Sequence, residues 1–489
     1  MDVLLKIVQT INTYLTDYIL IVLLVGVGIF YTVRTRFVQV RCFGEGMKNV
    51  FGNIKLKGGK HAGGLSSFQA LATAIAAQVG TGNIVGASGA ILIGGPGAIF
   101  WMWIIAFLGM STIYAEATLA QKTRVTDENG NVQGGPVYYI KTAFRGKFGK
   151  FLAAFFAVSA MLALGFMGAM VQSNSIAENF AGVFSQFDAN ATAVKVIVGV
   201  LVAGFAAIIL IGGTQRLASV TEKIVPVMAL LYIVGGLLVL GINIVNVPKA
   251  FVMIFKYAFV PQAMIGGAVG IAIKTAISQG AKRGLFSNEA GMGSTPHAHA
   301  LANVKNPHEQ GTTAMIGVFI DTFVVLTMTA LVVISTLYCN GTINPADAGG
   351  VMDGVSKANM VQLAFSGSFA KLFGATAGNV IGSLYVAVCL FFFAFSTIVS
   401  WNYFGKVNFE YLFGKKVTIV YSVIAVAFIF LGSLLSNDLV WELTDMFNYL
   451  MVLPNAIALL ALSGMVVCCV KNKNALPEIK DAPETKEEN

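Results

Sequence analysis

Charged residues are scarce in this chain of 489 residues, where Asp, Glu, Lys and Arg together make up only 11%. A soluble globular protein carries about 25%, so the supply is too small for a water-soluble surface. Proline is also rare, with 11 residues, and this excludes proline-rich disorder and collagen. Hydrophobic residues, in contrast, make up 56% of the chain. Their runs of about 20 residues predict an all-α polytopic membrane protein and not a β-barrel.

Sequence motifs of enzymes are missing as well. None of the five cysteines has the spacing of a metal site, and His297 and His299 are two residues apart, so they do not share one face of a helix. The sequence contains no Walker loop, zincin helix or nucleophile elbow. No soluble segment is long enough to form a nucleotide-binding domain. These absences argue against an enzyme, a primary pump and an organic cofactor.

Apolar runs divide the chain into candidate membrane spans with short loops between them. About 11 transmembrane helices are predicted. They cover Tyr18–Val33, Phe68–Ile93, Ala98–Ala120, Phe151–Glu178, Val194–Ile211, Ile224–Val245, Gly266–Ala302, Thr312–Leu337, Val380–Phe404, Val417–Leu435 and Phe447–Val470. Because this number is odd, the two termini are expected on opposite sides of the membrane.

Basic residues collect in alternate loops. The loop after the first span contains Arg34, Arg36, Arg41, Lys48, Lys55, Lys57 and Lys60, with Glu45 as its sole acid. The loop after the third span is also basic, whereas the charged residues of Asn437–Asp445 are all acidic. The positive-inside rule therefore predicts an N-terminus outside and a cytoplasmic C-terminus.

Four parts are predicted along the chain. Residues 1–67 form an N-terminal helix and a basic cytoplasmic loop, 68–246 a first set of five helices, and 247–470 a second set. Residues 471–489 are charged and lack apolar periodicity, so they are predicted to be a disordered cytoplasmic tail. A partly helical extracellular cap is expected around Val361–Phe373.

Two spans are interrupted by glycines next to polar residues, at Gly80-Thr81-Gly82-Asn83 and at Gly291-Met292-Gly293-Ser294. Each glycine disfavours helix by about 1 kcal/mol relative to alanine, so both spans are predicted to be discontinuous helices. One such motif alone is often a close-packing face, but here each opens a set of five spans. Because five spans carry the chain to the other side of the membrane, the second set enters the membrane from the side opposite to the first. This predicts a five-plus-five inverted repeat whose binding site lies where the two breaks meet.

Unwound backbone at membrane depth needs a partner for its peptide groups. In the first break, carbonyls near Ala76–Val79 suit Na⁺, and N–H groups from Gly82 onward suit a carboxylate. In the second, Ser294-Thr295-Pro296 predicts that a half-helix restarts after Gly293. The carbonyls of Asn288–Gly291 are then expected to be free to accept hydrogen bonds from an ammonium group.

Polar side chains inside other spans allow two interpretations each. Gln172 is either a site residue or a packing amide. Ser396 and Thr397 offer hydroxyls to a cation, but such residues also bond to their own helix. Trp401 follows them as a possible aromatic wall.

Three acids also fall within or near the spans. Asp321 and Glu289 are expected at membrane depth, where an acid is functional by default. They either couple transport to an ion or hold the broken backbone. Glu116 lies near the end of its span and is expected at the membrane interface.

Three motifs resemble those of the alanine or glycine:cation symporter family, also called sodium:alanine symporters. They are Gly94–Trp103, Gln78–Asn83 and Arg283–Ser294, and the likeness runs from about Tyr18 to Val470. The resemblance implies a leucine-transporter-like fold with one extra N-terminal helix. It also implies import of a small neutral amino acid, alanine or glycine, with Na⁺ by alternating access in a prokaryotic plasma membrane.

Site residues follow from the breaks and from this resemblance. The substrate-binding residues are expected to be Gln78, Gly80, Thr81, Gly82, Asn83, Gln172, Met292, Gly293, Thr397, Ile398 and Trp401. The resemblance to the wider fold class implies Na⁺ ligands from the carbonyls of Ala76 and Val79 and the hydroxyls of Ser396 and Thr397. Ala169 stands where the family often has a larger side chain, which implies a wider pocket.

Other functions remain open on the sequence alone. They are a proton-coupled carrier using Asp321 or Glu289, a transporter of broader specificity of the serine or glutamine type, and an amino-acid-binding membrane sensor or channel. The expected partners are a small neutral amino acid, Na⁺ and membrane lipids, with no nucleic acid and no obligatory protein partner.

Overall fold

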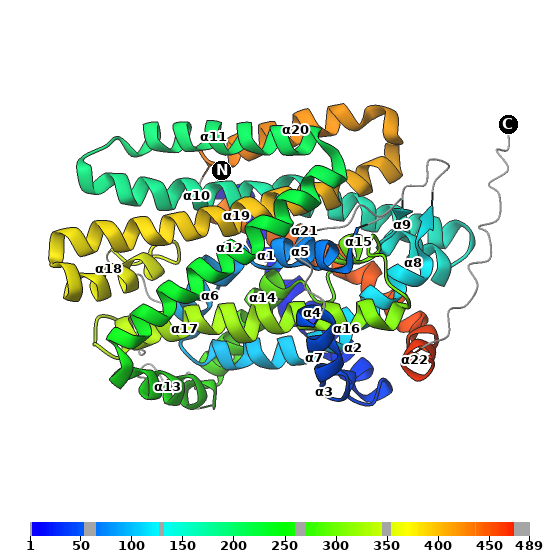
Figure 1. The fold of residues 1–489 in the computed structure, drawn as a ribbon, viewed down its shortest axis with the longest axis horizontal. Helices are drawn as coiled ribbons and strands as arrows, with labels where there is room; N and C mark the ends of the chain where they lie inside the picture. The colour runs from blue at the N-terminus through cyan, green and yellow to red at the C-terminus, as the bar shows by residue number, and fades with distance from the viewer. Residues whose placement is uncertain are drawn as a thin grey trace.

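The computed structural model describes residues 2–52, 65–126, 132–259, 269–344, 354–435 and 437–473. Most of these residues are helical, and the long helices lie roughly along one axis (Figure 1). The predictions for Lys55, Lys57, Lys60 and for the tail from 474 to 489 fall outside the described residues.

The first part of the chain leads from the N-terminus to a small helix after the sixth predicted span. Its elements are α1 (Asp2–Tyr14), η1 (Leu15–Leu20), α2 (Ile21–Arg34), α3 (Val38–Arg41), α4 (Phe43–Phe51), α5 (Ser67–Gln78), η2 (Gly82–Gly86), α6 (Ala87–Gly94), α7 (Ala98–Thr123), β1 (Val125–Thr126), β2 (Val132–Gln133), α8 (Pro136–Ala143), α9 (Gly146–Ala160), η3 (Met161–Gly168), α10 (Ala169–Phe184), η4 (Ser185–Phe187), α11 (Ala191–Ile211), α12 (Gly213–Ile242), η5 (Ile244–Asn246) and α13 (Val247–Phe259). The strands β1 and β2 form an antiparallel hairpin.

The second part begins with the other interrupted span. Its elements are α14 (Val269–Asn288), α15 (Pro296–His299), α16 (Pro307–Val318), η6 (Phe319–Leu326), α17 (Thr327–Val333), η7 (Ile334–Tyr338), α18 (Met360–Phe373), α19 (Ala375–Phe413), η9 (Lys415–Val417), α20 (Thr418–Gly432), α21 (Asn437–Ala461) and α22 (Ser463–Lys471). The segments η2, η3, η6 and η7 are π-helical turns within longer helices.

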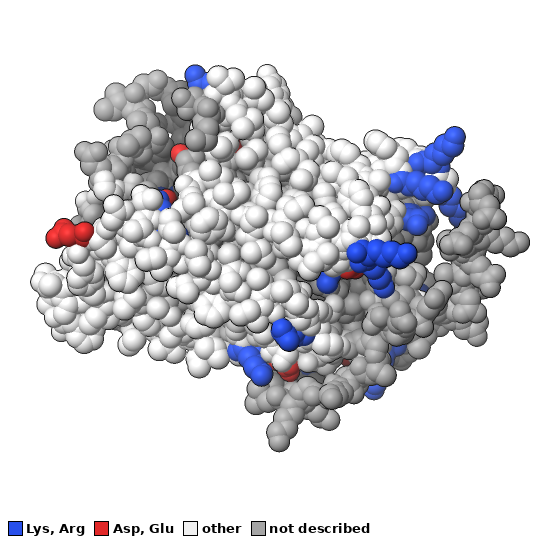
Figure 2. Space-filling model, turned by 90° about the horizontal axis from the view of Figure 1, so that it is seen from above, with Lys and Arg blue, Asp and Glu red and all other residues white. Residues whose placement is uncertain are grey.

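Eight helices among the described residues are long and apolar enough to cross a membrane, and the bent pair α5 and η2–α6 makes up to nine. This establishes a multi-pass membrane protein, while the number eleven and the inverted repeat stay predictions. Lys and Arg gather at one end of the molecule (right side of Figure 2), where Figure 1 places α8, α9 and α22.

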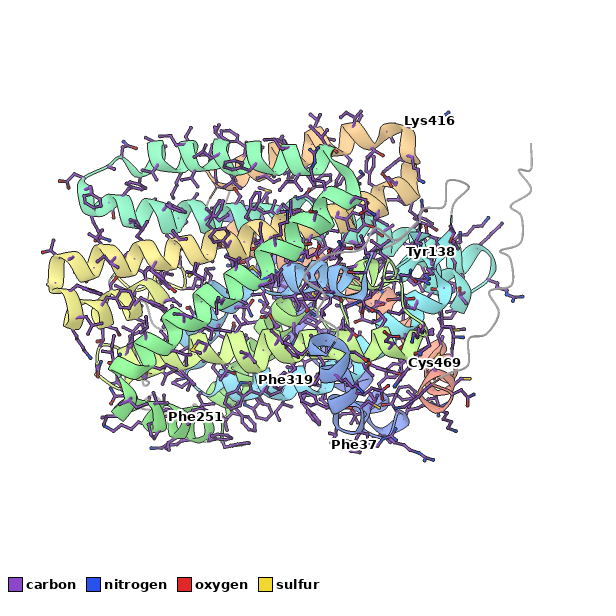
Figure 3. All side chains as sticks on the ribbon, viewed as in Figure 1. Phe37, Tyr138, Phe251, Phe319, Lys416 and Cys469 are labelled. Atoms are coloured by element: carbon purple, nitrogen blue, oxygen red, sulfur yellow. The ribbon has the colours of Figure 1, made fainter. Side chains whose placement is uncertain are left out.

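The predicted cap is confirmed as a helix, because α18 covers Met360–Phe373 and packs along α19. Helix α13, in contrast, was not predicted. Its buried residues Ala250, Ile254 and Ala258 recur every four positions and form one face. This face lies on α7, where the Trp101 indole donates to the carbonyl of Ala258 at 3.3 Å. Figure 3 shows Phe251 of α13 at the opposite end of the molecule from Tyr138.

The predicted boundaries of the last span are wrong. The prediction was Phe447–Val470, but α21 begins at Asn437 and ends at Ala461, and α22 follows as a separate short helix. The acids in the first turns of α21 lowered its apparent hydropathy. Asp445 is nevertheless buried there, because its carboxylate lies 3.1 Å from the guanidinium of Arg283.

Candidate functional site

The first break interrupts the helix as predicted. Helix α5 starts with a capping box, in which Ser66 and Gln69 bond to each other's backbone N–H groups, and it stops at Gln78. Val79 leaves the helix with φ −82° and ψ 87°, and η2 starts at Gly82. The two pieces are bent by 44° relative to each other. The helix is therefore discontinuous at Gly80, in the interior of the protein.

Neutral side chains satisfy the free N–H groups of this break. The N–H of Gly80 donates to Asn83 Oδ1 at 3.0 Å, and the N–H of Thr81 donates to Oε1 of Gln172 on α10 at 3.1 Å. A Cβ at Gly80 would lie 2.4 Å from Thr397 Oγ1 and 3.2 Å from Gln172 Oε1. Position 80 therefore admits only glycine, and Gln172, Thr397 and the break share one small space.

The candidate Na⁺ ligands come from α5 and α19. Thr397 Oγ1 donates to the carbonyl of Ala76 at 2.9 Å, and Ser396 Oγ reaches the same carbonyl at 3.4 Å. Both hydroxyls also contact the Phe393 carbonyl of their own helix. The structure thus brings Ala76, Ser396 and Thr397 together, and Val79 lies at the adjoining end of α5.

The second break is also confirmed, but the chain after it differs from the prediction. Glu289, Gly291 and Gly293 have φ angles of 58°, 93° and 79°, so the backbone leaves the helix of α14 there. The predicted half-helix after Gly293 is only one turn long, α15, and Thr295 makes no side-chain cap. After α15, Ala302 forms an isolated parallel β-bridge with Leu65.

Two of the carbonyls expected to be free in the second break are already bonded. Gln78 Nε2 donates to the carbonyl of Asn288 at 2.9 Å, and Asn455 Nδ2 donates to that of Gly291 at 2.9 Å. The expectation that these groups await an ammonium is therefore wrong, because partners distant in sequence occupy them.

Glu116, which was expected near a membrane interface, makes contacts inside the protein. It is fully buried in α7, where its carboxylate accepts the N–H of Gly291 at 3.0 Å and that of Gly293 at 2.9 Å. Asn455 Nδ2 donates to it at 2.6 Å, and Tyr139 donates to Asn455 in turn. Glu116 thus binds the second break from inside the protein. The sequence feature that could have identified this role is an acidic residue within an apolar run, because such a residue in a membrane span is functional by default.

Asp321, on the π-helical turn η6, connects the two breaks. Its Oδ1 accepts from Asn83 Nδ2 of the first break at 2.7 Å, and its Oδ2 accepts from Ser287 Oγ beside the second break at 3.0 Å. The breaks also touch directly, since a Cβ at Gly82 would lie 3.0 Å from the Cα of Ser287. Both oxygens of Asp321 are occupied, which favours the interpretation that it holds the broken backbone.

Glu289 contacts the aromatic side of the site. Its carboxylate accepts from Trp401 Nε1 at 2.5 Å and from Ser294 Oγ. The Trp401 ring meets Phe286 edge to face, with 5.6 Å between centroids. Met292 is fully buried in the same turn.

Ile398 and Ala169 are also fully buried, but they belong to a different group. They pack with Val202 and Ile429 in an apolar cluster between α10, α11, α19 and α20. The predicted pocket residues therefore divide into a polar set around the breaks and an apolar set beside it.

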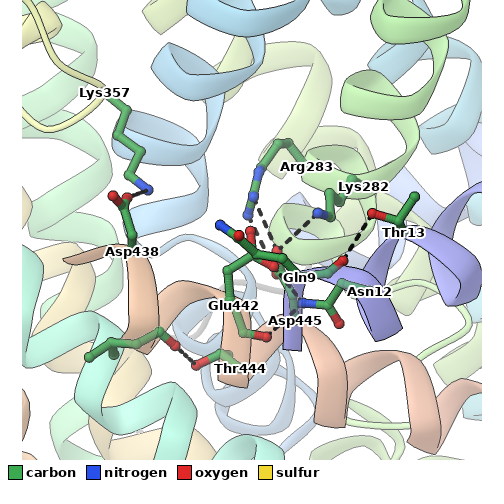
Figure 4. Close-up of polar contacts among 11 residues, drawn as sticks. Gln9, Asn12, Thr13, Lys282, Arg283, Lys357, Asp438, Glu442, Thr444 and Asp445 are labelled. Carbon is green, nitrogen blue, oxygen red and sulfur yellow. Dashed lines mark hydrogen bonds and ion pairs between the residues drawn. The ribbon is translucent and has the colours of Figure 1, made fainter. Parts of the chain in front are cut away.

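The charged side chains of Arg283, Lys357, Asp438 and Asp445 border the site (Figure 4). The Arg283 guanidinium lies 4.9 Å from the Trp441 ring and the Lys357 ammonium 5.3 Å from it. Trp441 in turn meets Phe286, with 4.8 Å between centroids. Asp445 and Asp438 pair with the two basic residues. The aromatic wall of the site thus continues into a layer of compensated charges.

The site itself is uncompensated. Glu116, Glu289 and Asp321 are all completely buried. Among the described residues, none of them lies within ion-pair distance of Lys, Arg or His. A buried carboxyl group without a counter-charge either takes up a proton or binds a cation. Both outcomes are compatible with a site that handles a cation or a substrate with a positive group.

Known proteins resemble the chain over its whole length. The sodium/alanine symporter AgcS of Methanococcus maripaludis is 40% identical over 96% of this chain and 97% of its own. A putative sodium/proton-dependent alanine carrier protein, YrbD of Bacillus subtilis, is 37% identical over 95% of this chain and 91% of its own. The probable sodium/glutamine symporter GlnT of the same bacterium is 37% identical over 94% and 89%.

The model of the sodium:alanine symporter family matches residues 1–486. These relatives are transporters and not enzymes, and the match leaves almost no part of the chain outside the family. Cation-coupled symport of an amino acid is therefore the activity of this class of protein. On sequence similarity over its full length, the chain belongs to the sodium:alanine symporter family.

Proposed function

We propose that this protein imports a small neutral amino acid, alanine or glycine, together with Na⁺ across a prokaryotic plasma membrane. The observation that carries the proposal is the first break. Its N–H groups face neutral acceptors on Asn83 and Gln172, and its carbonyl at Ala76 faces the Thr397 hydroxyl. One short segment thus offers donors for an anion beside acceptors for a cation.

The substrate carboxylate replaces the side-chain acceptors on Gly80 and Thr81. This exchange is favourable because a carboxylate forms hydrogen bonds about twice as strong as those of a neutral amide. The substrate ammonium then faces Glu289, whose carboxylate lies beside Trp401. A site that binds both charges of a zwitterion rejects molecules lacking either one.

Na⁺ binds next to the substrate, at the Ala76 and Val79 carbonyls and the Ser396 and Thr397 hydroxyls. Oxygen ligands of this kind suit a small hard cation. At a membrane potential of 100 mV, one entering positive charge contributes about 2.3 kcal/mol, enough for roughly 50-fold accumulation. The ion therefore supplies the driving force for uptake.

The proposed topology is that of the sequence prediction, with the N-terminus outside, the basic end in the cytoplasm and two inverted sets of five helices. The charge distribution in Figure 2 supports this orientation. Cysteine accessibility at exposed Lys415 and at Asp188, each replaced by cysteine, tests it from the two sides of intact cells.

Uptake of labelled alanine into proteoliposomes tests the function, with Na⁺ replaced by choline at constant pH. We expect uptake against a gradient with Na⁺ and none with choline. A proton-coupled carrier, for which Glu289 and Asp321 are the candidates, keeps its uptake in choline when a pH gradient is applied.

Competition by each standard amino acid and by D-alanine then defines the substrate. Strong competition by glutamine supports the broader specificity that Ala169 implies. Binding without accumulation indicates a sensor, and flux only down a gradient indicates a channel.

A further inference from the structure

Cys42, Glu45 and His308 lie together at a place that the proposed transport site does not use. Cys42 precedes α4, Glu45 lies in the first turn of α4, and His308 is in the first turn of α16. The sulfur, a carboxylate oxygen and a ring nitrogen all lie within 4.8 Å of one another. These three atom types are the usual protein ligands of zinc.

His308 is oriented as a ligand. Its side chain is 2% exposed, and Nδ1 is 2.6 Å from the hydroxyl of Tyr114 on α7. The other nitrogen, Nε2, faces Glu45 Oε1 at 3.1 Å, which is an ion-pair distance without hydrogen-bond geometry. A histidine ring that is fixed by a hydrogen bond on one nitrogen and directs the other toward further ligand atoms has the usual arrangement of metal-binding histidines.

Glu45 and Cys42 present complementary atoms. Lys473, just after α22, contacts Glu45 Oε2 at 2.5 Å and leaves Oε1 facing the histidine. Cys42 is almost fully buried and is a free thiol.

We propose that Cys42 Sγ, Glu45 Oε1 and His308 Nε2 bind a transition-metal ion of the Zn²⁺ type. On binding, the Cys42 thiol releases its proton to water and the thiolate takes the ion. Solvent or a further side chain completes the coordination. The bound ion cross-links α4 to α16 and, through Lys473, to the end of α22.

Cysteine spacing gave no sign of such a site. Cys42 and Glu45 are one helical turn apart, but the histidine comes from a helix in the second half of the chain. The ligand types differ from those of the Na⁺ site, which are carbonyls and hydroxyls. The two sites therefore select different ions.

Co²⁺ is the probe for the test, because thiolate ligation gives it a characteristic charge-transfer absorption. The full-length protein in detergent is titrated with Co²⁺ and then with Zn²⁺. We expect the thiolate band to appear and to vanish when Zn²⁺ displaces Co²⁺. We also expect Zn²⁺ to raise the midpoint of thermal unfolding, because it binds only the folded state.

Three variants remove one ligand each: Cys42→Ser, Glu45→Gln and His308→Gln. Each should weaken Co²⁺ binding by more than the roughly 10-fold that loss of an outer-shell partner already costs, and Cys42→Ser should also abolish the thiolate band. Cys468→Ser is the matched control, because Cys468 is an exposed free thiol outside the cluster. It should keep both the band and the affinity.

The proposal is overturned if the parent protein shows no thiolate band, if the band survives in Cys42→Ser, or if it disappears in Cys468→Ser. Thermal unfolding of each variant without metal identifies any that fails to fold. Since Glu45 is partly exposed, its variant provides a fair test even where the buried His308 variant does not fold.

Discussion

The two breaks of the broken helices look alike in the sequence but are built differently. In the first, the N–H groups of Gly80 and Thr81 bond to neutral amide oxygens. In the second, those of Gly291 and Gly293 bond to the Glu116 carboxylate. Charge-assisted hydrogen bonds are roughly twice as strong as neutral ones. The first break can therefore exchange its partners for a ligand, whereas the second is held by the protein's own anion.

This comparison teaches that a glycine-opened helix is not in itself a binding site. Both breaks leave peptide groups that need partners inside a membrane. What decides their role is whether the protein already supplies a strong partner. The following experiments test whether the second break is structural and the first one functional.

Removing the carboxylate of the second break should have the largest effect. Glu116→Leu leaves the N–H groups of Gly291 and Gly293 without an acceptor and removes one of the two acceptors of Asn455 Nδ2, and breaking such a network costs about 3–5 kcal/mol. We expect a large fall in the midpoint of thermal unfolding in detergent and in the yield of folded protein. Glu116→Gln, which keeps one acceptor oxygen, should lose less. If Glu116→Leu is as stable as the parent, the hydrogen bonds of Glu116 to this break do not stabilise the protein.

Filling the first break should abolish transport without unfolding the protein. In Gly80→Ala the new Cβ lies 2.4 Å from Thr397 Oγ1, so the space shared by the proposed substrate and Na⁺ is lost. We expect Na⁺-dependent alanine uptake in proteoliposomes to fall to background. Gly204→Ala is the matched control, because a Cβ there meets nothing within 4 Å. Normal uptake by Gly80→Ala contradicts a site at this break.

Removing a neutral acceptor from the first break should affect substrate affinity more than stability. Gln172→Leu leaves the N–H of Thr81 without its partner, at a cost of about 1–3 kcal/mol. We expect the KM for alanine to change by roughly 5- to 150-fold. The unfolding midpoint should fall less than in Glu116→Leu. An equal loss of stability in the two variants removes the distinction between the breaks.

A smaller change is expected at the proposed ion ligands. Thr397→Val removes one hydroxyl from the Ala76 carbonyl and keeps the shape of the side chain. One hydrogen-bonding group of this kind is worth about 0.5–1.5 kcal/mol, so the Na⁺ concentration for half-maximal uptake should rise about 3- to 10-fold. Ser400→Ala is the control on the same helix, since the Ser400 hydroxyl has no partner among the described residues. A change in substrate KM alone argues against an ion site here.

The sequence was sufficient to predict the positions of both breaks. Paired glycines next to polar residues in an apolar run have a local physical consequence, so no distant contact is needed to recognise them. The cap helix α18 and the proximity of Ala76 to Thr397 were also expected, the latter through the family resemblance. These features depend on short motifs.

Features that depend on distant partners were missed or misplaced. The role of Glu116 requires Gly291, which lies on another helix far along the chain. The early start of α21 requires Arg283 to neutralise Asp445. Sequence analysis scores such acids as exposed, because the residues that satisfy them are brought near only by the fold.

The hydrogen bonds of Glu116 have a consequence for conformational change. They connect the turn after α14 to α7, so these two segments are expected to move together as one rigid body. A transporter must expose its substrate to each side of the membrane in turn, and the second break has little freedom to bend. The hinge of this movement is therefore expected at Val79 and Gly80.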